Sequence, residues 1–344
     1  MSGTSLDGID LAELKFQVDE NEKWCFEILK SIIVNYPPTW KKALQDAFYY
    51  SEEKMLQFNE QYTQYLAEVI SEFIKHNNIH DLDAVCSHGH TIWHQPKMGM
   101  TLQIGNLSSL AKKTGQKVVC DFRVQDVQLG GNGAPLVPIG DRLLFGEYDY
   151  CLNLGGFANI SYEDQKENRI AYDVCPVNIV MNHFAELCGK PYDDRGLIAA
   201  SGKLNADLLT KLNSLDYYIK PAPKSLGMEW VQHKIVPILK DSGLSSEDIL
   251  HTFVEHVAIQ LAAQFHESSS VLITGGGAYN EYLINRLKFH SKVNITIPSS
   301  VIVEYKEALI FGLLGVLKLR NSMNCLASVT GAENDHSSGH IFIP

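Results

Sequence analysis

The carboxylate of Asp173 lies where a base for proton transfer is expected. The residues just before it, 169–172, are predicted to form a strand. Polar residues at the carboxyl end of such a strand face the ligand crevice of an α/β sheet. A carboxylate there can take a proton from a water or hydroxyl nucleophile, so this position predicts a general base for phosphoryl transfer.

A structural role is the alternative for Asp173. Pro176 can occupy the first position of a helix, and apolar residues follow at helical spacing until Gly189: Ile179, Val180, Phe184 and Leu187. An aspartate before such a helix can cap its N-terminus or complement the helix dipole without any part in catalysis.

Glycine-rich turns supply places where an anion could bind. The chain opens with a turn of small, hydroxyl and acidic residues: Ser2, Gly3, Thr4, Ser5, Leu6, Asp7, Gly8 and Asp10. Glycine permits positive φ and lets backbone N–H groups approach phosphate oxygens, which hydroxyl groups can also bind. For this segment alone, a surface β-turn with an exposed aspartate is the alternative.

Two further glycine turns lie in the second half of the chain. Asn153 precedes Gly155-Gly156 between two predicted strands, and a strand at 271–274 leads into Gly275, Gly276 and Gly277. A triple glycine between strand and helix permits close approach of a flat or anionic ligand, although alone it is a weak signal. Strand–turn–strand units half a chain apart predict two related lobes that present phosphate turns to one cleft.

Polar residues at two more predicted strand ends could bind a second substrate. One group follows the strand at 84–86: Ser87, His88, Gly89 and Thr91. With His90 and His94 it suggests zinc, but no further ligands with metal spacing follow, so metal is disfavoured. Arg123 follows the strand at 117–120, where a guanidinium suits a carboxylate ligand or forms an ordinary surface pair with an aspartate.

The composition predicts a compact soluble protein of two domains. The chain has 344 residues, 45% of them hydrophobic and 20% charged, which is enough for two cores and argues against disorder. The net charge of −11 disfavours nucleic acid or an anionic membrane as a partner. The seven cysteines lie mostly in apolar runs, and neither a signal peptide nor a membrane span is visible, so a cytoplasmic location is expected.

Strands and amphipathic helices are predicted around these sites. Strands are expected at 11–18 and 24–34. Apolar residues at helical spacing predict long helices over 55–73 and 249–265 and an apolar helix over 308–317.

Eight motifs occur in an order that resembles the anhydro-N-acetylmuramic acid kinases of the sugar kinase, Hsp70 and actin superfamily: MSGTSLDGID, SHGHTIWHQP, TLQIGN, DFRVQDVQLGGNGAPLVP, NLGGFANIS, YDDRG, TGGGAYN and SVTGA. The resemblance implies an α/β, two-lobed ribonuclease H-like (actin-like ATPase) fold with the active site in the interlobe cleft. The lobes would comprise 1–145 plus 306–344, and 146–305. It also implies ATP and Mg²⁺, a small sugar substrate and a homodimer.

The resemblance implies roles for the candidate residues. Asp173 would be the base, the turn at 3–10 with Asn153 and Gly155-Gly156 would bind phosphates, and Gly275 to Gly277 would bind adenosine. Ser87, His88, Gly89 and Thr91 would lie beside the sugar, and Arg123 would bind its lactyl carboxylate. Asp7 would be a weaker candidate for organising Mg²⁺.

The chain departs from the family pattern in three places. Gln125 replaces a second arginine, and Val174, Cys175 and Val177 replace residues of an Asp-Thr-Gly-Pro-x-Asn motif. The family also has an apolar strand before the first motif, which begins here at Met1. The first lobe is therefore expected to lack a strand beside 11–18 or to be distorted locally.

Two other functions fit parts of the sequence. A kinase for a different amino or anhydro sugar would need the same turns and base. A nucleotide-gated binding protein like actin or Hsp70 would hydrolyse ATP slowly and independently of sugar, and the changed residues beside Asp173 favour it.

Overall fold

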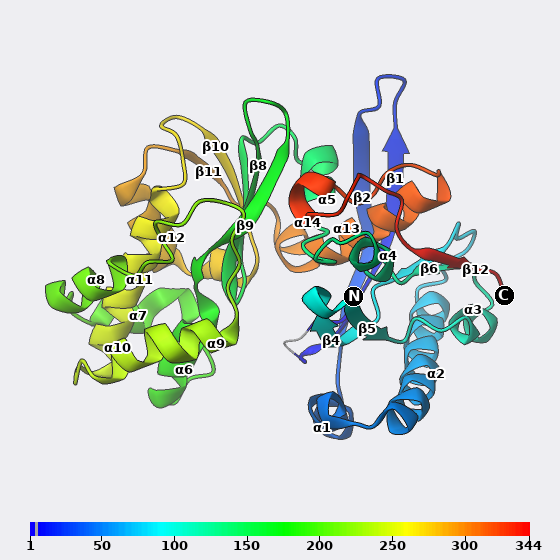
Figure 1. Cartoon of the computed structure of the whole chain (residues 1–344), viewed down its shortest axis with the longest axis horizontal. Coiled ribbons are helices and arrows are strands. Elements are labelled where there is room, and N and C mark those ends of the chain that lie inside the picture. The colour runs from blue at the N-terminus through cyan, green and yellow to red at the C-terminus, as the bar shows by residue number, and fades with distance from the viewer. Residues whose placement is uncertain (4–5) are drawn as a thin grey trace. The chain divides into compact units, whose positions relative to one another are not determined.

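The computed structural model describes residues 1–3 and 6–344, and these divide into two compact units (Figure 1). Unit 1 comprises Met1–Leu144 and Tyr305–Pro344, and unit 2 comprises Phe145–Glu304. These limits differ by one residue from the predicted lobes. The cleft between lobes stays a prediction.

The described residues of unit 1 form three small sheets. A parallel pair, β3 (Val85–Ser87) with β6 (Val118–Cys120), is extended by antiparallel β12 (His340–Phe342). Antiparallel pairs are formed by β1 (Gly8–Val18) with β2 (Trp24–Asn35), and by β4 (His90–Gln95) with β5 (Met100–Ile104). The helices are α1 (Pro38–Asp46), α2 (Glu52–His76), α3 (Ser109–Thr114), α4 (Val124–Gln128), α5 (Pro138–Leu144), α14 (Ala327–Thr330) and α13 (Ser300–Leu319), which begins in unit 2.

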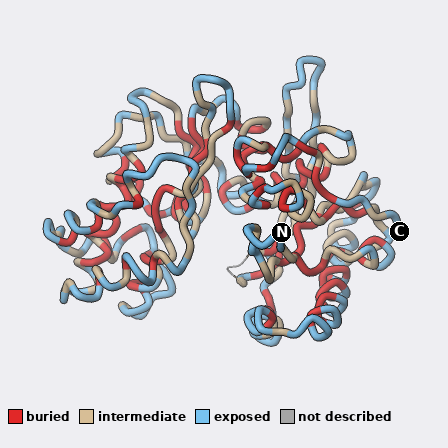
Figure 2. Tube along the Cα trace, in the orientation of Figure 1, coloured by how far each residue is buried: buried red, intermediate tan, exposed pale blue. Residues whose placement is uncertain are grey.

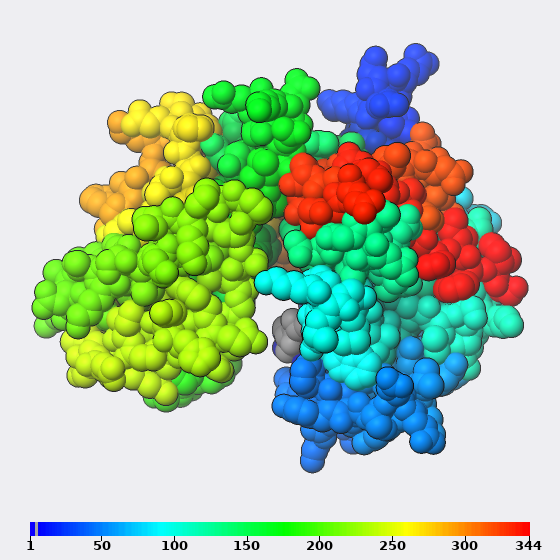
Figure 3. Space-filling model, in the orientation of Figure 1, coloured from blue at the N-terminus to red at the C-terminus, as the bar shows by residue number. Residues whose placement is uncertain are grey.

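The two edges of β1 differ in their pairing. Along one edge it pairs with β2, whereas its other edge carries only a bridge from Ile9 to Ser2 among the described residues. The tip of this hairpin is exposed and stands out from the rest of unit 1 (Figures 2 and 3).

The predicted helix over 55–73 is confirmed as part of α2. Its N-terminus is capped by Ser51, whose Oγ accepts a hydrogen bond from Lys54 N. Its apolar stripe is buried at Met55, Phe58, Tyr62, Leu66, Val69 and Ile70. These residues form the core that supports the polar ends of β3 and β6.

Unit 2 contains a five-stranded sheet in the order β11-β10-β7-β8-β9. The strands are β7 (Tyr150–Leu154), β8 (Phe157–Glu163), β9 (Arg169–Pro176), β10 (Ser270–Thr274) and β11 (Asn294–Thr296). β10 is parallel to β7 and β11, and β8 is antiparallel to β7 and β9. The helices are α6 (Asn178–Leu187), α7 (Leu197–Ser201), α8 (Ala206–Asn213), α9 (Met228–Trp230), α10 (Val236–Lys240), α11 (Ser246–Ala262) and α12 (Glu281–His290).

The helix α11 forms the centre of the unit 2 core. It confirms the helix predicted over 249–265, although it starts three residues earlier, where Ser245 Oγ accepts a hydrogen bond from Asp248 N. Its side chains are buried on nearly every face, and they pack with apolar side chains of the sheet and of α6 and α12. This core holds the strand ends of the sheet in fixed positions.

Candidate functional site

The strand that carries Asp173 is longer than its sequence suggests. The prediction that it ends at Asp173 is wrong, because β9 continues through Val174 and Cys175 to Pro176. β9 is the edge strand of the sheet, where proline costs no ladder hydrogen bond. A register shift in β8 between Ala158 and Asn159 sets Asn159 opposite Asp173.

Both carboxylate oxygens of Asp173 accept hydrogen bonds. Asn159 Nδ2 donates to Oδ1 and Leu226 N donates to Oδ2 at 2.7 Å. Tyr217 Oη donates to the Asp173 carbonyl at 2.6 Å, so the loop before α9 also holds the backbone. Burial raises the pKa of this half-buried carboxyl, while the hydrogen bonds from Leu226 and Asn159 oppose the rise.

A role for Asp173 as a helix cap is excluded by these contacts. The residue before α6 is Val177, no side chain caps that helix, and Pro176 belongs to the strand. The carboxylate is therefore a half-buried acceptor that ordinary helix capping does not explain.

The glycine turns of unit 2 lie at one edge of the sheet. β7 and β10 are parallel, with Asn153 opposite Thr274, so Gly155 and Gly275 follow at adjacent strand ends. A Cβ at Gly275, where φ is +80°, would lie 2.7 Å from Asn153 Oδ1. The second turn also joins α6, because Asn178 Nδ2 donates to Leu154 O.

A cavity of about 680 Å³ lies beside this edge. Its lining combines the third glycine turn with α6 and the loop before α7: Asn178, Met181, Asn182, Tyr192, Asp193, Asp194, Arg195, Gly276, Gly277, Ala278, Tyr279, Asn280, Glu281 and Ile297. Its apolar and polar walls and its size fit a nucleoside. Gly276 leaves room for one, since a Cβ built there would meet only Asn178 Nδ2 at 3.9 Å.

The loop at 192–196 carries the YDDRG motif. The structure places it in the cavity wall, with each side chain in a different role. Asp193 is buried and accepts hydrogen bonds from Ile198 N and Ala199 N at the start of α7, whereas Arg195 forms an exposed 3.7 Å ion pair with Glu281. The glycine of this loop, Gly196, was the one sequence feature that could have indicated its close packing. A Cβ there would lie 2.2 Å from Asn280 Oδ1.

Two glycines of the third turn should respond differently to substitution. Gly276→Leu is expected to weaken ATP binding tenfold or more with little change in melting temperature, because the added side chain enters the cavity. Gly277→Ala is expected to destabilise unit 2 by about 1–3 kcal/mol, since its Cβ would lie 2.7 Å from Leu154 Cβ. Calorimetric titration with ATP and thermal unfolding distinguish the two; unchanged ATP affinity in Gly276→Leu would mean that the nucleotide binds elsewhere.

The first turn is only partly described. Thr4 and Ser5 lie outside the described residues. Leu6, with φ +59°, takes the left-handed conformation and its N–H donates to Gly3 O. The prediction that Gly8 supplies a positive φ is wrong; Gly8 is required because a Cβ there would lie 2.5 Å from Val34 O of β2.

The two acids of this turn differ in exposure. Asp7 is exposed, while Asp10 is half-buried in β1. The pKa of Asp10 is raised, mainly by burial. The N-terminal ammonium group opposes this rise, and the charge of Asp7 adds to it. The carboxylate of Asp7 is thus the more accessible oxygen donor for a hydrated cation.

His88 and Arg123 are brought together as a hydrogen-bonded pair. Arg123 Nε donates to His88 Nε2 at 2.9 Å and Arg123 Nη1 donates to Gly133 O at 2.6 Å. His88 must then be a neutral tautomer whose Nδ1–H donates to Gly89 O at 2.9 Å. Burial, followed by the charge of Arg123, lowers the pKa of His88 well below 6.5.

The other predicted sugar-side residues lie around this pair. Ser87 Oγ accepts a hydrogen bond from Gly89 N. Glycine is required at position 89 because φ is +71° and a Cβ there would lie only 2.5 Å from Ile104 O. Thr91 lies on β4 opposite Gln103.

The three histidines of this segment have different hydrogen-bond partners. Arg123 donates to His88 Nε2, and His90 Nδ1 is hydrogen-bonded to Ser2 Oγ at 2.8 Å. His94 Nδ1 is hydrogen-bonded to Thr101 Oγ1 at 3.1 Å.

A nucleoside-sized cavity, glycine turns at parallel strand ends and a shielded carboxylate are together typical of enzymes that transfer a phosphoryl group from a nucleotide. The family model described as anhydro-N-acetylmuramic acid kinase matches residues 1–344, and the chain belongs to this family.

Relatives with the name anhydro-N-acetylmuramic acid kinase match over almost their whole length. The chain is 32% identical to that of Mannheimia succiniciproducens, covering 99% of this chain and 97% of the relative. It is 30% identical to that of Haemophilus influenzae, covering 99% and 96%. It is 33% identical to that of Hydrogenovibrio crunogenus, covering 100% and 97%.

A solved structure, the activator of the 2-hydroxyisocaproyl-CoA dehydratase from Clostridium difficile with bound ADPNP, is more distant. Its TM-score is 0.37 at 16% identity, covering 64% of this chain and 86% of that chain. At this level the likeness carries no argument about the fold.

Two bulk properties follow from the described residues. None of the seven cysteines, all of which the structure describes, forms a disulfide. Among residues 1–3 and 6–344, no helix has the length and apolar character that crossing a bilayer requires.

Proposed function

We propose that the chain is an ATP-dependent kinase that hydrolytically opens 1,6-anhydro-N-acetylmuramic acid and phosphorylates O6, giving N-acetylmuramic acid 6-phosphate in peptidoglycan recycling. Family membership supports the activity, and the contacts of Asp173 support the placement of the chemistry in unit 2.

In this proposal Asp173 is the base. It takes a proton from a water molecule whose oxygen attacks the anomeric carbon C1. The bond between C1 and O6 breaks, and O6 forms a bond to the γ-phosphorus as the bond from phosphorus to ADP breaks. Burial raises the pKa of Asp173, which makes its carboxylate a better base than a solvated one.

The remaining roles fall to binding groups. The turn at Gly3, Leu6, Asp7, Gly8 and Asp10 and the turn at Asn153, Gly155 and Gly156 would bind the phosphates of ATP through backbone N–H groups. Gly275 to Gly277 would contact adenosine. Mg²⁺, held in part by the exposed Asp7, would offset phosphate charge.

On the sugar side, Arg123 is the group suited to the lactyl carboxylate. Its Nε and Nη1 are engaged by His88 and Gly133, which fixes the plane of the guanidinium. A planar fork held in place binds a carboxylate with little loss of side-chain freedom.

The central observation is the double hydrogen bonding of Asp173 in the sheet that carries two glycine turns. β8 begins at Phe157, directly after Gly156, and Asn159 is its third residue, so this strand connects the second turn to the residue that orients the carboxylate.

A labelled-product assay tests the proposal. The protein, ATP, Mg²⁺ and the anhydro sugar are incubated in ¹⁸O-water, and the product is analysed by mass spectrometry. The expected product carries one phosphate on O6 and one ¹⁸O on C1. A phosphorylated product from a different amino or anhydro sugar alone would favour the other sugar kinase, and slow ATP hydrolysis indifferent to sugar would favour the nucleotide-gated binding protein.

The pH profile tests the environment of Asp173. Asn159 donates a hydrogen bond that favours the ionised carboxylate and lowers the pKa. Asn159→Ala should therefore raise that pKa further, and kcat/KM should begin to fall at a higher pH as the solution is acidified. Asn168→Ala, in the exposed turn after β8, is the control that should leave the profile unchanged. If the fall of kcat/KM on acidification occurs at the same pH in Asn159→Ala as in the parent, the assignment of Asp173 as the base is contradicted.

We also propose that the enzyme acts in the cytoplasm as a homodimer on a small sugar, without nucleic acid or membrane. The net charge of −11 supports the absence of these two anionic partners. Light scattering coupled to gel filtration measures the oligomeric state.

A further inference from the structure

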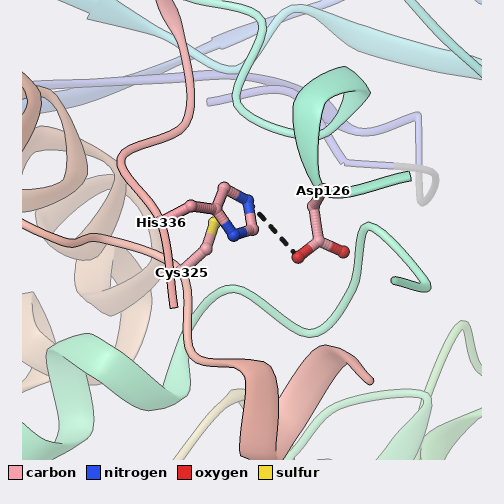
Figure 4. Close-up of side chains that lie close together, drawn as sticks. All are labelled: Asp126, Cys325 and His336. Atoms are coloured by element: carbon pink, nitrogen blue, oxygen red, sulfur yellow. Dashed lines mark ion pairs between the residues drawn. The ribbon is translucent and has the colours of Figure 1, made fainter. Parts of the chain in front are cut away.

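A buried cluster of three potential metal ligands joins α4 to the C-terminal segment of unit 1. Asp126, Cys325 and His336 each direct one ligand atom toward the others, and these atoms lie within 4.8 Å of one another (Figure 4). All three are buried, with 0%, 2% and 5% of their surface exposed. Among the described residues this is the one group of its kind.

The hydrogen bonds of His336 fix which nitrogen faces the cluster. Nδ1 lies 3.0 Å from Asn334 O, and a carbonyl can only accept, so Nδ1 carries the proton. In the neutral ring Nε2 then has a lone pair and no proton. This atom has no hydrogen-bond partner and lies 3.5 Å from Asp126 Oδ1.

Two electron-rich atoms therefore face each other in a buried environment. The carboxylate of Asp126 accepts hydrogen bonds from Thr330 Oγ1 at 2.7 Å and Gly133 N at 2.6 Å, so its orientation is set by other groups. A lone pair directed at a carboxylate is repulsive unless a cation lies between them. That cation is either a proton, which makes His336 an imidazolium, or a metal ion.

The third member of the cluster favours the metal. The backbones of Cys325 and His336 exchange hydrogen bonds of 3.0 and 3.2 Å, which hold the two side chains next to each other. Thiolate with imidazole is a donor set that zinc prefers, and carboxylate is its third common ligand. A histidine that ligates zinc usually donates its other N–H to a carbonyl or carboxylate, as His336 does to Asn334.

We propose that Asp126, Cys325 and His336 supply three of the four ligands of a bound zinc ion, with water as the fourth. Zinc bonds of about 2.0–2.3 Å would separate the ligand atoms by roughly 3.3–3.6 Å, so side-chain shifts of about 1 Å bring the three protein ligands to bonding distance. The ion would fasten residues 325–336 to α4, whose N-terminal flanking residue is Arg123. The C-terminal segment thereby supports the arginine that recognises the sugar acid, although the zinc site itself does not depend on that function.

Reconstitution with metal tests the site in the full-length protein. Chelator-treated protein is titrated with Zn²⁺ against a chromophoric competitor, and separately with Co²⁺. We expect one equivalent of Zn²⁺ per chain, a higher melting temperature with zinc, and a thiolate-to-cobalt charge-transfer band in the near ultraviolet. Cys325→Ser and His336→Gln should each weaken Zn²⁺ binding at least tenfold.

Matched controls separate this site from others in the chain. Cys151→Ser replaces a buried thiol of β7 in unit 2, and His340→Gln replaces an exposed ring near the C-terminus; both should bind zinc like the parent. Absence of stoichiometric zinc and of the cobalt band in the parent protein would overturn the proposal in favour of an imidazolium–carboxylate pair. Equal zinc affinity in Cys325→Ser would overturn it too. If a variant does not fold, the cobalt spectrum of the parent still decides.

Discussion

Asp173→Asn is expected to lower turnover about a thousandfold while ATP binding survives. Asparagine has nearly the same shape but cannot take a proton from the attacking water. Burial raises the pKa of Asp173, so folding disfavours its ionised form at neutral pH. The melting temperature of the variant should therefore be equal to or higher than that of the parent. Steady-state kinetics, ATP titration and thermal unfolding measure the three quantities.

A matched control is Asp164→Asn. Asp164 also accepts backbone hydrogen bonds, from Lys166 N and Asn168 N, but in an exposed turn. It should retain turnover within about twofold, since surface substitutions have small effects. Turnover near that of the parent in Asp173→Asn would remove the assigned base and with it the proposed mechanism.

Arg123→Gln is expected to raise KM for the anhydro sugar that carries the lactyl acid about 100-fold. Loss of one partner of a hydrogen-bonded charge pair costs about 2–5 kcal/mol, and 1.4 kcal/mol corresponds to a factor of ten. Kinetics with 1,6-anhydro-N-acetylglucosamine, which has no carboxylate, provide the contrast. For that sugar the parent and the variant should have similar KM values.

An equal loss for both sugars would show that Arg123 supports the structure rather than the acid. The hydrogen bonds to His88 and Gly133 make that alternative concrete. Arg320→Gln, an exposed arginine of the same unit, should change neither KM.

The elements with strong local patterns could be predicted from the sequence. α2 and α11 have apolar residues at helical spacing and serine caps, so local signals and tertiary packing agree. The end of β9 could not be predicted, because Pro176 is typical of a helix start and only its pairing with Phe157 of β8 reveals an edge strand. A proline is compatible with either a helix start or an edge strand, and only contacts with residues distant in the sequence decide between the two.

The residues of the candidate site also divide into those that a local pattern indicates and those that only long-range contacts reveal. Asp173 and the two glycine turns of unit 2 were identifiable because each follows a short apolar strand. The residues that orient Asp173 were not, since Tyr217 and Leu226 reach it from 44 and 53 residues further along the chain. The contact of Thr330 with Asp126 likewise spans 204 residues. Polar groups that act through such distant partners leave no periodic signal in the sequence.

The neutral state of His88 has a consequence for the environment in which the enzyme can work. Its ring donates to Gly89 O and accepts from Arg123, and burial with the charge of Arg123 lowers its pKa, so the hydrogen bonds and the surroundings both favour the uncharged ring. The guanidinium beside it is therefore not opposed by a second positive charge from this ring. In the proposed function, the affinity of Arg123 for the lactyl acid should change little on mild acidification.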